Sequence, residues 1–388
     1  MIPAGPLSGI TVIDMTRVLA GPFATMVLHD LGARVIKVES PAGGDDSRHF
    51  GPFKDGVSSY FASLNKGKQS IALDLKRAED REIFEALLGR ADVLVENFRP
   101  GTMAKLGFAP ERLRQDHPGL IYAACSGFGQ NGPLREKPAY DIVVQGMGGV
   151  MSITGHPGGA PTRVGAAVGD ITAGLYTAIA VSAALRERER TGQGALIDIA
   201  MLDCQFAILE NAIARYQFTG EAPQAIGNRH PSITPFEAYA SADGHIIIAA
   251  GNDALFDRLC TTLELGDLRA DPRFADNLSR NRHVDALKAL IEPVTRTRET
   301  AHWLAALEAA GIPCGPINTV PQALETPQVD ARNMLVSVED PDAGPLRFAG
   351  NPIKFADHAD APTRGAIPRL DADRAALLAE LGLATPGD

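Results

Sequence analysis

The sequence predicts an α/β fold built on a parallel β-sheet, followed by a second, smaller α/β unit. Two observations carry this prediction. Short runs rich in valine, isoleucine and leucine alternate with helical patterns over about the first 200 residues, as is typical of strands that are buried on both faces of a parallel sheet. After Gly220 the composition changes to proline, glycine and alanine, and new strand and helix patterns follow.

Composition narrows the class of protein. A chain of 388 residues with 45% hydrophobic and 22% charged residues is typical of a globular protein of more than one domain. A net charge of −10 without a basic cluster argues against a nucleic-acid partner. No signal-peptide pattern and no apolar run of about 18 residues is present, which argues against a membrane role. The four scattered cysteines form no CxxC pair, so we expect a cytoplasmic enzyme without a metal site or disulfides.

The first part of the chain contains the strand–helix alternation. Strands are expected at 9–16, 33–40, 70–75, 91–98 and 120–128. Helices are expected at 21–31 and 79–90, the second with an apolar stripe and an acidic start. Such an open, doubly wound sheet binds ligands beyond the carboxyl ends of its strands, so we expect the functional site there.

The middle of the chain begins with a glycine-dominated segment. Residues 146–159 predict a loop, residues 171–190 a long helix, and residues 196–203 a strand that runs into a helix.

The segment after residue 220 predicts a linker and then a second unit. Its strand is expected at 245–251, and its helices at 254–265, 282–295 and 300–310. A strand and a helix are expected in the tail. We therefore predict a large domain over 1–224, a small domain over 225–330 and a C-terminal segment over 331–388 that returns to the large domain.

Several common chemistries have no motif in this sequence. No GxGxxG follows a strand, and there is no P-loop, HExxH motif or GxSxG elbow, since Ala124 stands where the elbow needs glycine. Carboxylates, glycine-rich loops and a few cations near strand ends remain as candidates.

Asp170 is the most conspicuous of these carboxylates. It is the single charged residue in VGAAVGDITAGLYTAIA, residues 164–180. One interpretation is a helix N-cap, a position that aspartate favours. The other is that the carboxylate takes part in the chemistry.

Several longer motifs carry a family resemblance. They are TRVLAGPFATMVLHDLGARVIKVE, GDDSRHFGP, LDLK, VENFRPG, PAYD, VGAAVGDITAG, AAGND and AGIPCGPIN. From Leu7 to about Phe355 the chain resembles the family III CoA-transferases, also called the CaiB/BaiF or formyl-CoA transferase family. The resemblance implies a Rossmann-like large domain, a smaller domain, and two chains interlocked in a homodimer.

The resemblance also implies an activity. Members move CoA from an acyl-CoA donor to a carboxylic acid, so acyl-CoA and acid are substrates and no tightly bound cofactor is expected. The aspartate that matches Asp170 attacks the thioester, which gives an aspartyl anhydride and then an aspartyl-CoA thioester. Asp170 is therefore implied to be the nucleophile.

CoA contacts are implied at the positions that match the family motifs. They are Leu19, Ala20, Leu73, Lys76, Asn97, Phe98, Lys105 and Tyr140. Ordinary structural roles remain open: Leu73 and Phe98 as core, and the two lysines as solvated charges. Arg163 could hold a substrate carboxylate, and His230 lies in a segment that approaches the acyl site in related enzymes, although a turn histidine is the simpler interpretation.

Alternative functions also remain open. An α-methylacyl-CoA racemase shares the fold, but its histidine base corresponds here to Tyr140, a poor base at neutral pH. A non-catalytic acyl-CoA-binding protein is the third hypothesis. No glycine run like that of formyl-CoA transferase occurs between Gly220 and Cys260, and the motifs most resemble succinyl-CoA-dependent dicarboxylate transferases of the glutarate type. The tail segment AIPRLDADR also departs from the family pattern.

Overall fold

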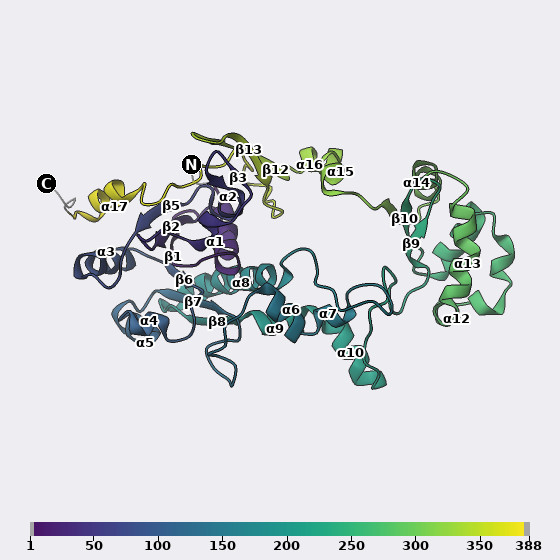
Figure 1. Cartoon of the computed structure of the whole chain (residues 1–388), viewed down its shortest axis with the longest axis horizontal. Helices are drawn as coiled ribbons and strands as arrows, with labels where there is room; N and C mark the ends of the chain where they lie inside the picture. The colour runs from purple at the N-terminus through teal and green to yellow at the C-terminus, as the bar shows by residue number, and fades with distance from the viewer. Residues whose placement is uncertain (1–3, 384–388) are drawn as a thin grey trace. The chain divides into compact units, whose positions relative to one another are not determined.

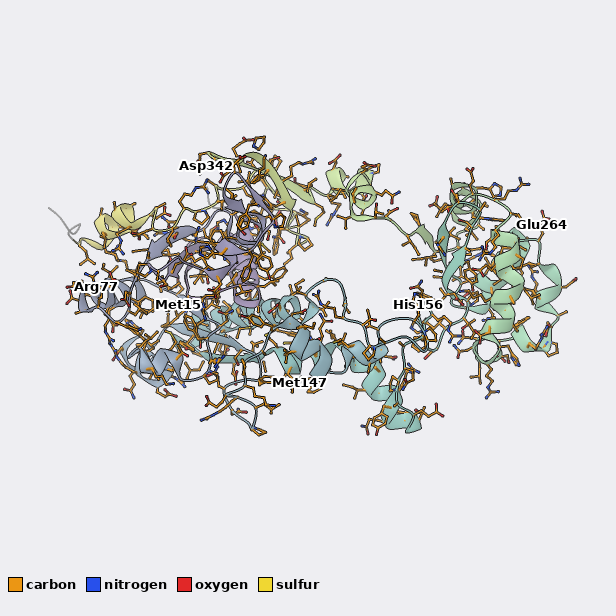
Figure 2. All side chains as sticks on the ribbon, viewed as in Figure 1. Met15, Arg77, Met147, His156, Glu264 and Asp342 are labelled. Carbon is orange, nitrogen blue, oxygen red and sulfur yellow. The ribbon has the colours of Figure 1, made fainter. Side chains whose placement is uncertain are left out.

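The computed structural model describes residues 4–383, and these divide into two compact units (Figure 1). Within the described residues, unit 1 comprises 4–151, 163–221 and 327–383, and unit 2 comprises 152–162 and 222–326. The chain therefore enters unit 2 twice. The first passage, 152–162, contains His156, which Figure 2 labels; the sequence predicts this passage in the large domain.

Unit 1 is organised around a six-stranded parallel sheet, which confirms the predicted α/β class. Its strands are β1 (Thr11–Asp14), β2 (Arg34–Glu39), β5 (Gln69–Ala72), β6 (Val93–Glu96), β7 (Ile121–Ser126) and β8 (Leu196–Ala200). They lie in the order β5-β2-β1-β6-β7-β8, and every neighbouring pair is parallel. The direction of winding reverses between β1 and β6, so the carboxyl ends of these two strands form the topological switch point.

Helices cover both faces of this sheet (Figure 1). One face packs against α1 (Ala20–Asp30) and α8 (Val168–Thr191), and the other against α3 (Ala78–Leu88) and α17 (Arg374–Leu381). Successive strand residues alternate between the two cores, because neighbouring side chains of a strand point to opposite faces: Val12 joins the α8 side and Ile13 the α3 side. Met15, labelled in Figure 2, is also buried, on the α3 side.

The helix α8 is the longest in unit 1, and it packs closely on α1. By length and composition alone it could cross a membrane. One face of the helix packs against α1 and the sheet, where Ala178, Val181 and Leu185 belong to the buried core. Leu175, Tyr176 and Ile179, on the other face, are exposed. A Cβ atom on Gly174 would lie 2.7 Å from the carbonyl oxygen of Ala20, so glycine permits this close approach.

The remaining elements of unit 1 are short. Its helices are α2 (Ser59–Asn65), α4 (Thr102–Lys105), α5 (Pro110–Asp116), α6 (Asp141–Met147), α9 (Met201–Ile208), α10 (Glu210–Thr219) and α16 (Pro327–Ala331), with a 3-10 turn η1 (Asp46–His49). Two hairpins pair β3 (Phe53–Lys54) with β4 (Val57–Ser58), and β12 (Leu335–Asp340) with β13 (Gly344–Ala349).

The loop predicted over 146–159 is wrong in its first half. That part contains the end of α6 and all of α7 (Val150–Ile153). Gly148 lies in the turn between these two helices. A Cβ atom on it would lie 2.5 Å from Cβ of Gln205, so this glycine also lets the end of α6 approach α9.

Unit 2 has its own core and a three-stranded antiparallel sheet. The strands β9 (Phe236–Ala240), β10 (His245–Ala249) and β11 (Cys314–Pro316) lie in the order β11-β10-β9. Its helices are α11 (Asp253–Thr262), α12 (Asn277–Arg282), α13 (Val284–Thr295), α14 (Thr300–Ala309) and α15 (Val320–Leu324), with 3-10 turns η2 (Gly266–Arg269) and η3 (Pro272–Phe274). The linker predicted after residue 220 is therefore wrong at β9, where buried Tyr239 joins the core.

Candidate active site

A pocket of about 210 Å³ lies in unit 1 at the switch point of the sheet. The turn after β1 and the loop after β6 form part of its wall, and the start of α8 contributes Asp170. Its lining residues are Arg17, Val18, Leu19, Ala20, Asp46, Asn97, Phe98, Arg99, Pro100, Cys125, Ser126, Gly127, Arg135, Lys137, Pro138, Ala139, Tyr140, Asp170 and Met201.

Asp170 lies in the first turn of α8 and not at its N-cap. The N-cap is Ala167, so the capping interpretation is wrong. Burial, with a further contribution from the charge of Asp141, raises the pKa of Asp170 to about 7. Within residues 4–383 no side-chain or backbone donor forms a hydrogen bond with its carboxylate. The carboxylate thus faces the pocket without a donor that would lower its nucleophilicity.

Asp141, in the first turn of α6, fixes the start of α8. Its Oδ1 accepts a hydrogen bond from the Gly169 N–H at 2.8 Å, and its Oδ2 accepts one from Gln145 Nε2 at 2.8 Å. A Cβ atom on Gly169 would lie 2.6 Å from Val144 Cγ2, so glycine at this position allows the start of α8 to approach α6. The sequence analysis missed Asp141 although it lies within PAYD; the available signal was an acidic residue opening a helix.

Arg163 contacts this same carboxylate. Its Nη2 lies 3.2 Å from Asp141 Oδ2. In the structure the guanidinium is therefore engaged with Asp141, and it does not line the pocket. His230, in contrast, belongs to unit 2, where its Nδ1 accepts a hydrogen bond from the Ser232 N–H at 3.1 Å.

The loop after β6 is joined to the turn after β1 by Asn97. Its Oδ1 accepts a hydrogen bond from the Arg17 N–H, and its Nδ2 donates one to the Arg17 carbonyl oxygen, both at 2.8 Å. The Arg17 guanidinium lies 5.5 Å from the ring centroid of Phe98. These contacts bind the two switch-point loops together along the pocket wall.

Six of the sequence-predicted site residues line this one pocket. They are Leu19, Ala20, Asn97, Phe98, Tyr140 and Asp170. Because these residues come from segments far apart in the chain, their meeting depends on the order of the strands.

Three other predicted CoA contacts lie outside this pocket. Leu73 is buried in the core on the α3 side of the sheet, whereas Lys76 and Lys105 are exposed. Exposure of the two lysines is compatible with a CoA contact and with a solvated charge, so both interpretations stay open, and Leu73 packs as core.

The pocket wall also carries cations that the sequence analysis did not single out. Arg99 and Lys137 have no ion-pair partner among residues 4–383, whereas Arg17 pairs with Asp46 at 3.3 Å. Arg99 lies in the motif VENFRPG, which gave a signal for it. Unpaired cations beside a pocket suit an anionic ligand such as a carboxylate or a phosphate.

The arrangement supports acyl transfer through a carboxylate. The carboxylate of Asp170 faces the pocket, and Arg99 and Lys137 place positive charge on its wall; a carboxylate so placed can act as a nucleophile. Among residues 4–383 no group of three or more His, Cys, Asp and Glu side chains is arranged to hold a metal ion.

Comparison with known proteins also points to acyl transfer. The family model for CoA-transferase family III matches residues 7–374. The chain is 46% identical to an acetyl-CoA:oxalate CoA-transferase of Acetobacter aceti, covering 97% of this chain and 96% of the relative. It is 42% identical to a succinate–glutarate CoA-transferase of Agrobacterium fabrum, again covering 97% and 96%.

A solved structure agrees with these relatives. The crystal structure of a CaiB/BaiF family protein from Brucella suis superposes with a TM-score of 0.85 at 41% sequence identity, covering 97% of this chain and 99% of that one. Together with the family match and the identities of the relatives, this makes the chain an enzyme of the CoA-transferase class, and it belongs to CoA-transferase family III.

Proposed function

We propose that the protein transfers CoA from succinyl-CoA to a dicarboxylic acid, with Asp170 as the nucleophile. The observation that carries this proposal is the position of Asp170 in the pocket, beside the switch-point loops and without a hydrogen-bond donor within residues 4–383. Its pKa, raised to about 7 by burial, leaves a substantial ionised fraction at neutral pH together with high basicity.

The proposed reaction has four steps in which no atom is gained or lost. The Asp170 carboxylate attacks the donor thioester and expels CoA thiolate, which forms a mixed anhydride. The thiolate then attacks the Asp170 carbonyl carbon and releases the donor acid, which leaves an aspartyl-CoA thioester. The acceptor carboxylate displaces the thiolate to form a second anhydride, and the thiolate finally attacks the acceptor acyl carbon. Asp170 returns as a carboxylate.

The dicarboxylate part of the proposal rests on charge. One carboxylate of such an acid reacts, and the other needs a cation to replace its solvation. Arg99 and Lys137, which have no ion-pair partner among residues 4–383, supply positive charge on the pocket wall. The names of the two relatives, which mention oxalate and glutarate, point to the same class of acid.

A second candidate pair is acetyl-CoA with oxalate. It is favoured by the 46% identity to a transferase of that name. A matrix of succinyl-CoA, acetyl-CoA and formyl-CoA against acids of two to six carbons separates the candidates. We expect succinyl-CoA with glutarate or succinate to give the highest kcat/KM, and we expect dicarboxylates to exceed the monocarboxylates of equal length. The best rate with a monocarboxylic acceptor would refute the charge argument.

The covalent path has its own test. Donor acyl-CoA alone leaves an aspartyl thioester, which hydroxylamine converts to a hydroxamate on the peptide that contains Asp170. An acceptor labelled with 18O in its carboxylate passes one label to Asp170 and, in the next cycle, to the released donor acid. Full turnover without label transfer would contradict the anhydride steps.

A racemase is a poorer match to the pocket, because Tyr140 takes the place of the histidine base. We expect no deuterium at the α-carbon when a 2-methylacyl-CoA is incubated in D2O. We also propose a cytoplasmic, interlocked homodimer. Sedimentation at nanomolar concentration tests the dimer, because interlocked chains cannot separate without unfolding, and a folded monomer would refute it.

A further inference from the structure

The turn between β1 and α1 holds an unfavourable backbone conformation. Val18 has φ = 67°, in the left-handed region that β-branched residues rarely occupy. Strain of this kind persists only where surrounding contacts enforce it. Leu19 and Ala20, which follow directly, line the pocket with Asp170.

The first residue of this turn is held at both backbone polar groups by side chains. The Thr16 N–H donates to Asp14 Oδ1 at 2.9 Å, and Lys37 Nζ donates to the Thr16 carbonyl oxygen at 2.7 Å. Arg17, which follows, has its N–H and carbonyl bound by Asn97, as described above.

The strained residue itself is held by Asp45. Its Oδ1 accepts a hydrogen bond from the Val18 N–H at 3.0 Å, and its Oδ2 lies 2.9 Å from Lys37 Nζ. The side chains of Asp45 and Lys37 are both fully buried. One buried ion pair therefore holds the turn at Thr16 through Lys37 and at Val18 through Asp45.

We propose that Asp45 and Lys37 are positioning residues for CoA: their ion pair holds the turn of residues 16–18 in the strained conformation that presents Leu19 and Ala20 to the pocket. The inference rests on the proposed function, since CoA is taken as the ligand of this pocket. Neither residue lines the pocket, so each acts through the backbone that it binds. Binding is tighter when a wall is fixed before the ligand arrives, because less ordering remains to be done.

Two variants distinguish a specific effect on CoA binding from a general loss of stability. Asp45→Ala removes the hydrogen bond from Val18, the ion-pair partner of Lys37 and the two hydrogen bonds by which Asp45 caps η1 at Ser47. Asp30→Ala is the matched control, because Asp30 forms a similarly buried pair with Arg364 at 3.2 Å but lies at the opposite end of α1. Both variants lower Tm. We expect Asp45→Ala alone to weaken CoA binding, by roughly tenfold to a hundredfold, in calorimetric titration of the enzyme with CoA.

Val18→Gly keeps the test decisive if Asp45→Ala does not fold. Glycine adopts φ = 67° without strain, so Tm is unchanged or higher, whereas the freed turn weakens CoA binding severalfold. Val18 itself lines the pocket, so Val18→Ala measures what loss of its side chain costs in CoA affinity while alanine retains the steric restriction on the backbone. Opposite changes in stability and affinity cannot arise from simple destabilisation.

The outcomes are distinguishable. Equal CoA affinities of Asp45→Ala and Asp30→Ala, or wild-type affinity in Val18→Gly, would overturn the positioning role and leave the proposed function intact. A wild-type enzyme that does not bind CoA would overturn both. The inference is supported if Asp45→Ala loses affinity while Asp30→Ala stays near wild type, and if Val18→Gly binds CoA more weakly than Val18→Ala.

Discussion

Replacing Asp170 with its isosteric amide, asparagine, is expected to change two measurable quantities: the rate of CoA transfer and the free energy of unfolding. Asp170→Asn keeps the shape of the side chain but removes the charge and the ability to form an anhydride. We expect CoA transfer to fall by more than about three orders of magnitude, while CoA binding persists. Asp203→Asn is the matched control, because Asp203 is also a first-turn acid but is exposed in α9 and does not line the pocket.

The same substitution has an effect on stability that can be calculated. Burial raises the pKa of Asp170 from its ordinary value of 3.8 to about 7. The folded state thus holds this proton more tightly than the unfolded chain, so the wild type loses stability as the pH rises from about 4 through 7. At about 1.4 kcal/mol for each pH unit between these two pKa values, the free energy of unfolding falls by about 4 kcal/mol in all. Because the pocket admits solvent, we expect Asp170→Asn to be about 2–4 kcal/mol more stable than the wild type at pH 8.

Urea titration at pH 4 and pH 8 measures this difference. Circular dichroism follows the whole chain, whereas the single tryptophan, Trp303, lies in unit 2 and reports that unit by fluorescence. We expect the two proteins to be equally stable at pH 4 and to differ at pH 8 in the dichroism transition. Substantial activity in Asp170→Asn without deamidation to aspartate would refute the nucleophile. Equal stability of the two proteins at pH 8 would refute the raised pKa of the buried Asp170 carboxyl.

Three further predictions follow from the surroundings of the site. Asp141→Asn removes a negative charge that helps to raise the pKa of Asp170, so the acidic limb of the kcat–pH profile shifts to lower pH; an unchanged limb would contradict this coupling. Gly169→Ala places a Cβ atom 2.6 Å from Val144 Cγ2, so kcat and Tm both fall, and wild-type values of both would refute the close contact. Glu96→Leu leaves the buried Tyr122 hydroxyl and the part-buried Phe98 N–H without their acceptor, which lowers the free energy of unfolding by about 2–5 kcal/mol in urea titration, whereas Glu96→Gln, which retains an acceptor oxygen, has a much smaller effect.

The α/β class of unit 1 could be predicted because a strand that is buried on both faces consists of consecutive apolar residues, and such runs are visible in the sequence. Val12 and Ile13 are both apolar because each faces a different core. Glycine was the main source of error. Gly148 indicated a longer loop, but it lies in a two-residue turn between α6 and α7, where its lack of a side chain allows a close contact with Gln205, and local sequence cannot distinguish these two uses.

The composition of the site was only partly accessible for a different reason. Asp170 could be singled out because a charge within an apolar helix needs an explanation. Asp141 lies 28 residues before Gly169, and nothing local indicates that its carboxylate accepts a hydrogen bond from the Gly169 N–H. Similarly, Asp45 and Val18 meet only after β1 and β2 pair. Contacts set by strand order cannot be derived from the spacing of residues along the chain.

The placement of α17 bears on how the protein is made in the cell. Its Leu377 and Leu378 pack in the same core as Phe84 and Leu88 of α3, roughly 290 residues earlier. At typical rates of translation that interval takes roughly 15–60 s. During this time the α3 side of the sheet has incomplete apolar cover, although most of the sheet has already left the ribosome. The nascent chain is therefore a substrate for chaperones that bind exposed apolar surface, and a slow codon cluster between α3 and α17 lengthens that exposure.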